Sequence, residues 1–243
     1  MILISATDTV YYGRALNLAQ TFRKTNPTGE LYIYDLGMAQ NERATLGNLC
    51  KGILDVPRIN EYVLRPIRKH EKGAPGTVIG LYSWKPLIIH EEIKKHDQIL
   101  WADAGCSIIK DLSPLWEFIR QNTYFIKEVC NLGLMINKYP IEKLKVSKTE
   151  LETAGFSASF IGLTKKWIDS FALPVRQCCD DIELFRDDGS AFGGVIWGRH
   201  DQALLSLFAI RCGWKHCPQF HIPYLRKDLT SESIIYHGRG DIV

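Results

Sequence analysis

A single carboxylate followed by two small residues stands at the end of a short apolar run. Residues 98–101 suit a buried strand, the apolar run stops at Asp103, and Ala104 and Gly105 follow. In an open α/β sheet, ligands bind beyond the carboxyl ends of the strands. Mg²⁺ and Mn²⁺ prefer oxygen ligands and often share them with substrate phosphates. Asp103 therefore fits a metal–diphosphate site, although it could equally be an acid that only caps the next turn.

Four further residues could do chemistry, and three of them, Asp35, Asp201 and His237, also have a simpler structural explanation. Asp35 ends a second predicted strand and either contacts a ligand or only closes the strand-end turn. Lys85 lies at the start of a predicted helix, where it could face an anion. Asp201 stands where a helix cap belongs, but a carboxylate there could also act as a general base. His237 is either an exposed surface histidine or a metal ligand.

Strand and helix patterns alternate through the first half of the chain. Strands are expected at residues 1–6, 31–34 and 53–56 and just before Asp103; apolar residues at helical spacing predict helices around residues 15–22 and 46–50 and from Ser83 onward. Such alternation predicts an α/β protein with a mainly parallel sheet and right-handed crossovers.

Residues 58–80 interrupt the alternation with basic side chains and several glycines. This pattern predicts a flexible basic loop. The loop could close over a phosphate-bearing ligand, or it could be only a solvated connection.

The second half of the sequence is less regular. The expected elements are a helix capped by Ser113, one or two strands in 124–137, a short helix at 149–153, a buried strand over 154–163, a helix capped by Thr164, a turn at 193–194, a helix after Asp201 and a strand from residue 234. Because no repeat, low-complexity tract or clear linker separates these elements, we expect one compact domain covering residues 1–243.

Composition narrows the class of protein. The net charge of +3 is too small to suggest a nucleic-acid partner. Seven cysteines without a C-x-x-C pair indicate free thiols in a reducing compartment and argue against a zinc site. The first residues lack the basic start and long apolar core of a signal peptide, and no apolar run approaches the ~20 residues of a membrane span. We therefore expect a soluble, cytoplasmic protein.

Several motifs, taken in their order along the chain, carry a resemblance to a known family. They are Thr7-Asp8, Tyr34-Asp35-Leu36-Gly37, Tyr82-Ser83-Trp84-Lys85-Pro86, Leu100-Trp101-Ala102-Asp103-Ala104-Gly105, Ala154-Gly155-Phe156, Arg199-His200-Asp201-Gln202 and His237-Gly238. Over nearly its whole length the chain resembles a GT-A-fold glycosyltransferase, similar to glycosyltransferase family 8 and to uncharacterised DUF1647-type proteins. The resemblance implies a Rossmann-like mixed sheet, mainly parallel, with helices on both faces.

The resemblance also implies a function and a role for each matching position. The chain would be a hexosyl- or pentosyltransferase of glycan biosynthesis, taking a nucleoside diphosphate sugar, with a UDP-sugar favoured, and a glycan or other hydroxyl acceptor. Residues 1–112 would form the donor half, and residues 113–243 the acceptor half with a metal-ligand tail. The implied donor-binding residues are Ala6, Thr7, Asp8, Tyr12, Asp35, Lys85, Asp103, Ala104 and Gly105, the metal ligands for Mn²⁺ or Mg²⁺ are Asp103 and His237, and the catalytic residues are Asp201 and Gln202. Tyr12 would stack on the base.

One departure from the family pattern leaves two functions open. The family's D-x-D motif has a second acid where this chain has Gly105. Either Asp103, His237, phosphates and water hold the metal, or catalysis manages with little metal. The alternative function is a non-catalytic module that binds a nucleotide sugar or glycan. An oxidoreductase is disfavoured, because no G-x-G-x-x-G follows the first strand. For an inverting reaction Asp201 is the first candidate base, with Asp181 and Asp188 in reserve; in a retaining reaction Asp201 or Gln202 would face the cationic sugar.

Overall fold

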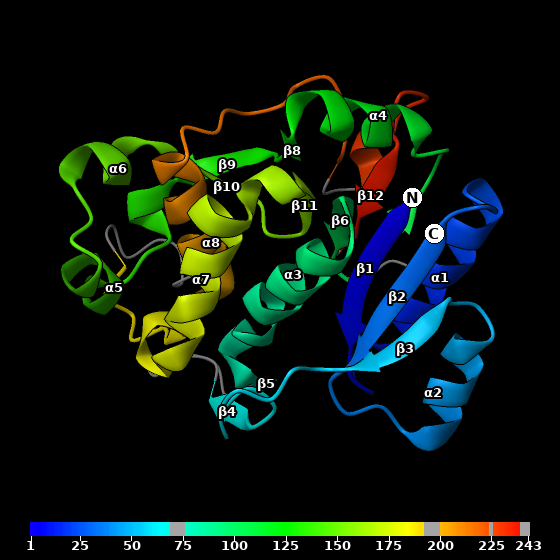
Figure 1. Ribbon diagram of the computed structural model, residues 1–243, viewed down its shortest axis with the longest axis horizontal. Helices are drawn as coiled ribbons and strands as arrows, with labels where there is room; N and C mark the ends of the chain where they lie inside the picture. Colours follow the sequence, from blue (N-terminus) through cyan, green and yellow to red (C-terminus); the bar gives the residue numbers. More distant parts are fainter. Residues whose placement is uncertain (69–75, 192–199, 224–225, 239–243) are drawn as a thin grey trace.

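A six-stranded mixed sheet forms the centre of the protein in the computed structural model, which describes residues 1–68, 76–191, 200–223 and 226–238. The strand order is β3-β2-β1-β6-β11-β8 (Figure 1). Its members are β1 (Ile2–Thr7), β2 (Glu30–Asp35), β3 (Gly52–Asp55), β6 (Gln98–Ala102), β11 (Phe160–Thr164) and β8 (Tyr124–Phe125). The first four run parallel, and β11 and β8 are antiparallel to their neighbours. The predicted mixed, mainly parallel α/β fold is confirmed.

The parallel half arises from the alternation expected from the sequence. Helices α1 (Tyr12–Thr25), α2 (Gln40–Gly47) and α3 (Trp84–Lys95) connect successive strands. Apolar residues of α1 at helical spacing, including Ala15, Leu18 and Phe22, are fully buried against the sheet. Helix α2 ends at Gly47, so Leu49 and Cys50 lie beyond it rather than on its apolar face.

The strand register brings the polar ends of the strands to one edge. Thr7 pairs with Asp35, and Ile4 pairs with Trp101. Two residues further along, Asp103 is therefore level with Ala6. The carboxyl ends of β1, β2 and β6 thus place their strand-end residues at the same edge, as ligand binding in an open α/β sheet requires.

The prediction of a single buried strand over residues 154–163 is wrong. The segment forms two strands: β10 (Ala154–Phe156) pairs with β9 (Glu128–Asn131), whereas β11 joins the central sheet beside β6. The chain changes sheets at residues 157–159, where the Asp103 amide donates a hydrogen bond to the Ser159 carbonyl at 3.0 Å. The segment is apolar, as the sequence indicates. Its division into two strands depends on the pairing partners β9 and β6, which are distant in sequence.

The last described strand returns to the centre of the molecule. β12 (Ile235–His237) pairs antiparallel with β7 (Cys106–Ile108), and His237 lies opposite Cys106. Figure 1 shows β12 beside the end of the central sheet. The predicted terminal strand is confirmed, and it carries His237 to the turn that follows Asp103.

Three predicted helix starts need correction. Helix α4 (Ser113–Asn122) includes Ser113 as its first residue, and the Asp111 carboxylate accepts the Ser113 N–H at 2.9 Å. Thr164 caps nothing with its side chain; its hydroxyl donates to the Thr123 carbonyl, and an irregular helical segment follows. Asp201 is the second residue of α8 (His200–Arg211), so it does not precede the helix. The turn predicted at residues 193–194 lies outside the described residues.

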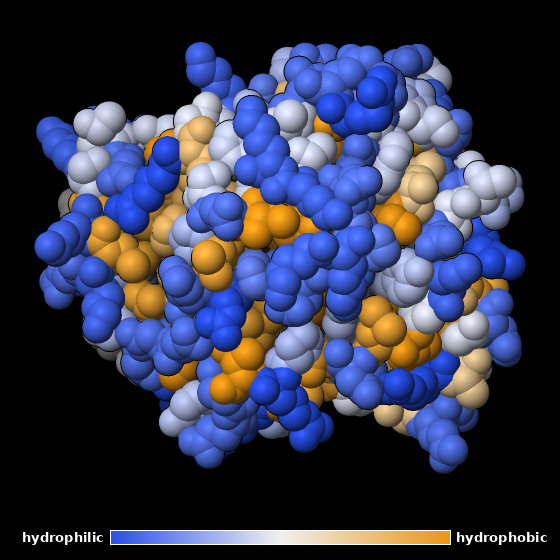
Figure 2. Space-filling model, viewed as in Figure 1, coloured by the Kyte–Doolittle hydropathy of each residue, from blue (hydrophilic) through white to orange (hydrophobic). Residues whose placement is uncertain are grey.

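Shorter helical elements complete the chain. They are η1 (Gly80–Tyr82), η2 (Leu132–Leu134), α5 (Lys138–Lys143), α6 (Lys148–Glu152), η3 (Lys165–Trp167), η4 (Ile168–Ala172), α7 (Leu173–Gln177), η5 (Cys178–Asp180), η6 (Ile182–Phe185) and η7 (Arg226–Asp228). Within the described ranges, no helix is long and apolar enough to cross a membrane. All seven cysteines are free thiols. Figure 2 shows one face of the molecule as mostly hydrophilic, with apolar side chains in several separate groups.

The basic segment at residues 58–80 is more ordered than a loop where the structure describes it. β4 (Pro66–Arg68) and β5 (Thr77–Ile79) form an antiparallel hairpin that leads into η1. Gly80, Leu81 and Tyr82 follow with three consecutive positive φ angles of 53°, 48° and 66°. Leu81 and Tyr82 are strained there, because side chains disfavour the left-handed region. Such strain clusters at functional sites, and this one immediately precedes the helix that carries Lys85.

Replacing Gly80 with alanine should destabilise the protein by at least about 2 kcal/mol. A Cβ at Gly80 would lie 2.2 Å from the Val63 carbonyl oxygen, and the residue's φ is +53°. Gly76→Ala is the matched control, because a Cβ there meets nothing within 4 Å. Urea unfolding of both variants measures the difference; equal stabilities would contradict the expected clash.

Candidate active site

A buried lysine joins two acids at the centre of the candidate site. Lys85, the second residue of α3, has its Nζ 2.9 Å from Asp103 Oδ1 and 2.7 Å from Asp201 Oδ2. The same Nζ donates a hydrogen bond to the Ala158 carbonyl at 3.2 Å. The three groups come from α3, the end of β6 and the first turn of α8. The fold therefore brings together three of the residues expected from the sequence, as one ion-pair cluster.

The Asp103 carboxylate does not act as a turn cap. The Trp101 indole N–H donates to Asp103 Oδ1 at 2.8 Å, on the same oxygen that faces Lys85. The turn after Asp103 is closed by its backbone carbonyl, which accepts the Cys106 N–H at 3.0 Å. The side chain of Asp103 is 30% exposed, against 5% for Lys85 and 9% for Asp201. Asp103 is thus the acid of this cluster that a ligand can reach most readily.

The two acids have different proton affinities. Burial alone would raise the pKa of Asp103, but the Lys85 ammonium and His237 lower it below its ordinary value. Burial raises the pKa of Asp201 above its ordinary value; the Asp103 charge adds to this, and Lys85 opposes it. Burial would lower the pKa of Lys85, yet the two carboxylates raise it. A fixed cation therefore lies between a firmly ionised acid and an acid that takes up a proton more readily.

An imidazole occupies the neighbourhood of the missing second acid. A Cβ on Gly105 would lie 3.6 Å from His237 Nε2 and 3.3 Å from the Gly238 carbonyl oxygen. The Phe160 ring meets the His237 ring edge to face, with centroids 6.2 Å apart. His237 also lowers the pKa of Asp103, so the two side chains are electrostatic neighbours. The His237 ring thus lies within van der Waals distance of the place where a side chain at position 105 would begin.

Asp103 and His237 alone would be an incomplete set of metal ligands. Within the described residues, no group of three or more His, Cys, Asp and Glu side chains could hold a metal ion. Mg²⁺ and Mn²⁺ commonly take one or two protein ligands and complete their shell with substrate phosphates and water. These two residues therefore fit a cation that is shared with a bound diphosphate, rather than one held by the protein alone.

Strand-end residues of β1 and β2 have local structural roles. Asp8 Oδ1 accepts the Tyr11 N–H at 2.9 Å in the turn before α1. Asp35 Oδ1 accepts the amides of Gly37 and Met38, and Oδ2 pairs with Arg43 at 2.5 Å. These contacts support the turn interpretation of Asp35. Ala6 and Thr7 are buried at the same edge. Nucleotide contacts by Ala6, Thr7, Asp8 and Asp35 stay predictions.

The exposed aromatic ring at this edge is Tyr11, one residue before the tyrosine chosen from the sequence. Tyr12 begins α1 and packs partly against the core, whereas Tyr11 is 39% exposed and has the Arg14 guanidinium 5.2 Å from its ring. Tyr82 is a second aromatic residue that the sequence reasoning missed. Its ring lies 5.4 Å from that of His200, and its pKa is raised mainly by burial, with Tyr11 and Asp201 contributing. The residue types do not reveal the positive φ angles before Lys85. The contact between the Tyr82 and His200 rings is therefore known only from the structure.

Gln202 and the two reserve acids do not join the Lys85 cluster. Gln202 Nε2 points to the Met135 sulfur at 3.2 Å. Asp181 accepts the Tyr139 hydroxyl and the Glu183 amide, and Asp188 accepts the Ser190 amide. These side chains hold local structure. Of the four acceptor-side candidates, Asp201 alone contacts Lys85.

Comparison with solved structures identifies the fold. The galactosyltransferase LgtC, in complex with donor and acceptor sugar analogues, is 15% identical and matches with a TM-score of 0.57 over 99% of this chain and 87% of that one. Mouse xyloside xylosyltransferase 1 is 12% identical, with a TM-score of 0.58 over 100% and 98% of the two chains. Core-mannan synthase A from Aspergillus fumigatus, in a Mn/GDP form, is 10% identical, with a TM-score of 0.50 over 86% and 68%.

These similarities show that the chain has the GT-A fold of glycosyltransferases, as the sequence resemblance implied. No protein-family model matches the sequence, and the search of curated proteins found no significant match. At such low identity the neighbours define the architecture, and function has to be argued from the site.

Proposed function

We propose that this protein is a glycosyltransferase that moves a sugar from a nucleoside diphosphate sugar to a hydroxyl group of a glycan or related acceptor. The Lys85 cluster carries the proposal, because it places a reachable, ionised Asp103 at the carboxyl edge of a GT-A sheet. A UDP-sugar is the first donor to test. The galactosyl- and xylosyltransferase neighbours support sugar transfer in general, without naming the donor of this chain.

Asp103 and His237 would hold a divalent cation, Mn²⁺ or Mg²⁺, together with the donor diphosphate. When bound, the cation stabilises the negative charge that grows on the leaving diphosphate. Lys85 keeps Asp103 ionised and fixes its Oδ1, so the other carboxylate oxygen remains for coordination. Lys85 is a positioning residue in this account, because both of its short contacts are to the two acids.

The transfer itself joins the acceptor oxygen to the anomeric carbon of the donor sugar. The bond from that carbon to the phosphate oxygen breaks, and the diphosphate leaves with the electron pair. In a direct displacement, the acceptor hydroxyl proton goes to a base, for which Asp201 is our candidate because burial raises its pKa. In a retaining reaction, the Asp201 carboxylate would instead stabilise the cationic sugar.

Hydrolysis of a panel of UDP- and GDP-sugars, first with Mn²⁺ and then with EDTA, tests the proposal. We expect one donor to turn over and its turnover to stop in EDTA. If donors raise the melting temperature but none is turned over even with acceptors present, the chain is a binding module. If no donor produces either signal, the nucleotide-sugar proposal is wrong.

Replacing His237 with alanine should raise the Mn²⁺ concentration for half-maximal activity by at least about tenfold. The alanine removes one of two protein ligands but leaves the backbone pairing of β12 with β7. His216→Ala is the control, because His216 is exposed and its ring accepts a hydrogen bond from the Glu128 amide. An unaltered Mn²⁺ titration would remove His237 from the proposed metal site.

A further inference from the structure

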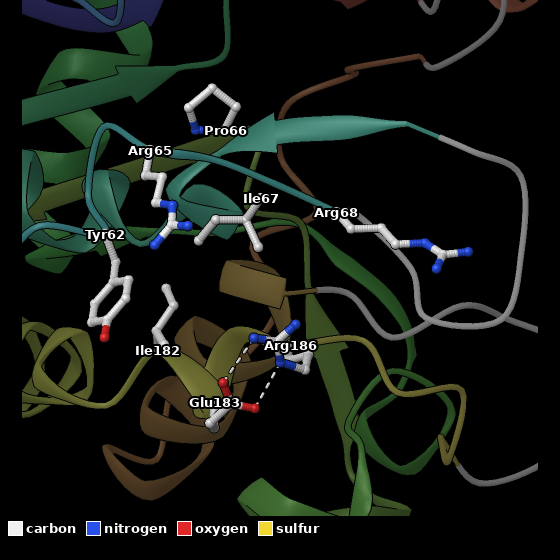
Figure 3. A pocket seen from close by; sticks show the side chains of 8 residues that line it. All are labelled: Tyr62, Arg65, Pro66, Ile67, Arg68, Ile182, Glu183 and Arg186. Carbon is white, nitrogen blue, oxygen red and sulfur yellow. Dashed lines mark hydrogen bonds and ion pairs between the residues drawn. The ribbon is translucent and has the colours of Figure 1, made fainter.

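A basic pocket with an aromatic wall lies between segments that lead to Lys85 and to Asp201, and the proposed transfer reaction does not use it. Its volume is about 400 Å³, and it lies between the β4–β5 hairpin and η6 (Figure 3). Arg65 and Arg68 come from the hairpin side, and Glu183 and Arg186 from the η6 side. The pocket therefore has one wall from each half of the chain.

The charges in the pocket favour an anion. The Arg186 guanidinium donates two hydrogen bonds to the Glu183 carboxylate, at 2.6 and 2.8 Å. Glu183 therefore largely neutralises the charge of Arg186. Among the described residues, the guanidinium groups of Arg65 and Arg68 form no ion pair. Figure 3 shows the Arg65 guanidinium beside Ile67 and facing Ile182, while the Arg68 side chain points away from the other labelled side chains. An unneutralised guanidinium facing a pocket is well suited to a carboxylate or phosphate, which it can bind through two parallel hydrogen bonds.

The uncharged part of the lining suits a sugar ring. Tyr62, Ile67 and Ile182 line the same pocket, and the Tyr62 ring is exposed. An aromatic face and apolar side chains cover the C–H surface of a ligand, while a few polar groups fix its orientation. The combination fits a molecule that has both an apolar ring face and a negative charge.

The two walls connect directly to the residues of the candidate active site. The Arg65 carbonyl accepts the Gly80 N–H at 2.9 Å, and η1 then leads into the helix that carries Lys85. On the other side, His200 Nδ1 lies 2.7 Å from the Phe185 carbonyl at the end of η6, and Asp201 follows His200. A ligand in the pocket is therefore next to the segments that position Lys85 and Asp201, on the side of them formed by the hairpin and η6.

We infer that this pocket binds an acidic sugar of the acceptor, through its carboxylate or phosphate at Arg65 and its ring at Tyr62. The binding itself follows from the pocket; the acceptor role rests on the proposed glycosyltransferase function. The inference narrows the acceptor from any hydroxyl compound to glycans that carry a negative charge.

Saturation-transfer NMR on the full chain tests the binding, with methyl β-glucuronide, methyl β-glucoside and methyl β-glucoside 6-phosphate as probes. We expect the wild type to bind the two charged probes about tenfold or more tightly than the glucoside, and Arg65→Ala to abolish this preference. Arg58→Ala is the control, because Arg58 is exposed on the same segment but does not line the pocket. Preference for the glucuronide or for the phosphate identifies the anion.

Equal binding of charged and neutral probes by the wild type, or a preference that survives in Arg65→Ala, would overturn the inference. The donor panel is measured separately, so the two failures are distinguishable. If a donor is turned over but the charged probes bind no better than the neutral one, the glycosyltransferase proposal stands and the acidic acceptor is excluded. If the protein prefers the charged probes but turns over no donor, even with the glucuronide present as acceptor, the pocket binds acidic sugars but its acceptor role is wrong. Where a donor is turned over, the ratio of kcat/KM for glucuronide and glucoside acceptors should fall in Arg65→Ala.

Discussion

Replacing Lys85 with methionine should destabilise the protein by about 3–5 kcal/mol at pH 7, since two buried or half-buried carboxylates then lack their shared cation. For a domain of this size the melting temperature should fall by roughly 6–20 °C. Methionine fills most of the space of the lysine stem, so the loss is electrostatic rather than a packing defect. Thermal and urea unfolding measure it. Lys94→Met is the matched control, because Lys94 lies on the same helix and its 3.4 Å ion pair with Glu91 is half exposed.

The Lys85→Met variant should also respond to pH in a defined direction. Without the ammonium, the pKa values of Asp103 and Asp201 both rise. Between the ordinary carboxyl pKa near 4 and these raised values, the native state then binds more protons than the unfolded state. Stability should therefore increase as pH falls through that window. The Lys85→Met/Asp201→Asn double variant should recover part of the lost stability at pH 7. If Lys85→Met is no less stable than Lys94→Met, the cluster is not the electrostatic centre described above.

Replacing Asp103 with asparagine should lower donor turnover by at least about 100-fold while leaving the fold intact. Asparagine keeps an oxygen for the Trp101 N–H and for Lys85, but it removes the charge that a cation and the leaving diphosphate require. Stability should change little, because Lys85 keeps Asp201 as a partner and Asp201 loses a repulsive neighbour. Donor hydrolysis, a Mn²⁺ titration and a melting curve measure the three effects.

Asp111→Asn is the control for the Asp103 variant. Asp111 is exposed and accepts the Ser113 amide and hydroxyl, and asparagine can do the same at such a turn. We expect its activity to match the wild type. Unchanged turnover in Asp103→Asn would exclude a metal role for Asp103, and loss of turnover through unfolding would show as a collapsed melting curve.

The parts of this protein that could be predicted from the sequence depend on local patterns. The strands before Asp35 and Asp103 are short apolar runs ending in an acid, so their existence and their shared edge follow from the sequence. The contact of Lys85 with Asp201 could not be predicted in this way, because the two residues lie on helices α3 and α8, which are far apart in the sequence. The resemblance proposed both residues as site residues, but the ion pair between them is a product of tertiary folding.

Element boundaries and short elements account for several other differences between the predicted and the observed structure. Helix α1 begins at Tyr12, which turns that ring toward the core and leaves Tyr11 exposed. The sequence predicts one strand where Ala154–Phe156 and Phe160–Thr164 form two, because both are apolar and only their pairing partners distinguish them. The basic segment before Gly80 has the pattern of a loop in the sequence, because strands as short as those of the β4–β5 hairpin show little alternation.

The pairing of β12 with β7 sets the order in which the site can be completed during biosynthesis. Asp103 emerges from the ribosome with the first half of the chain, but His237 reaches its place beside Gly105 only when nearly all described residues have been made. Until the last strand docks, the nascent chain would therefore present Asp103 without His237 beside it. A chain stopped before residue 235 should retain the parallel part of the sheet and yet lack one of its two proposed metal ligands.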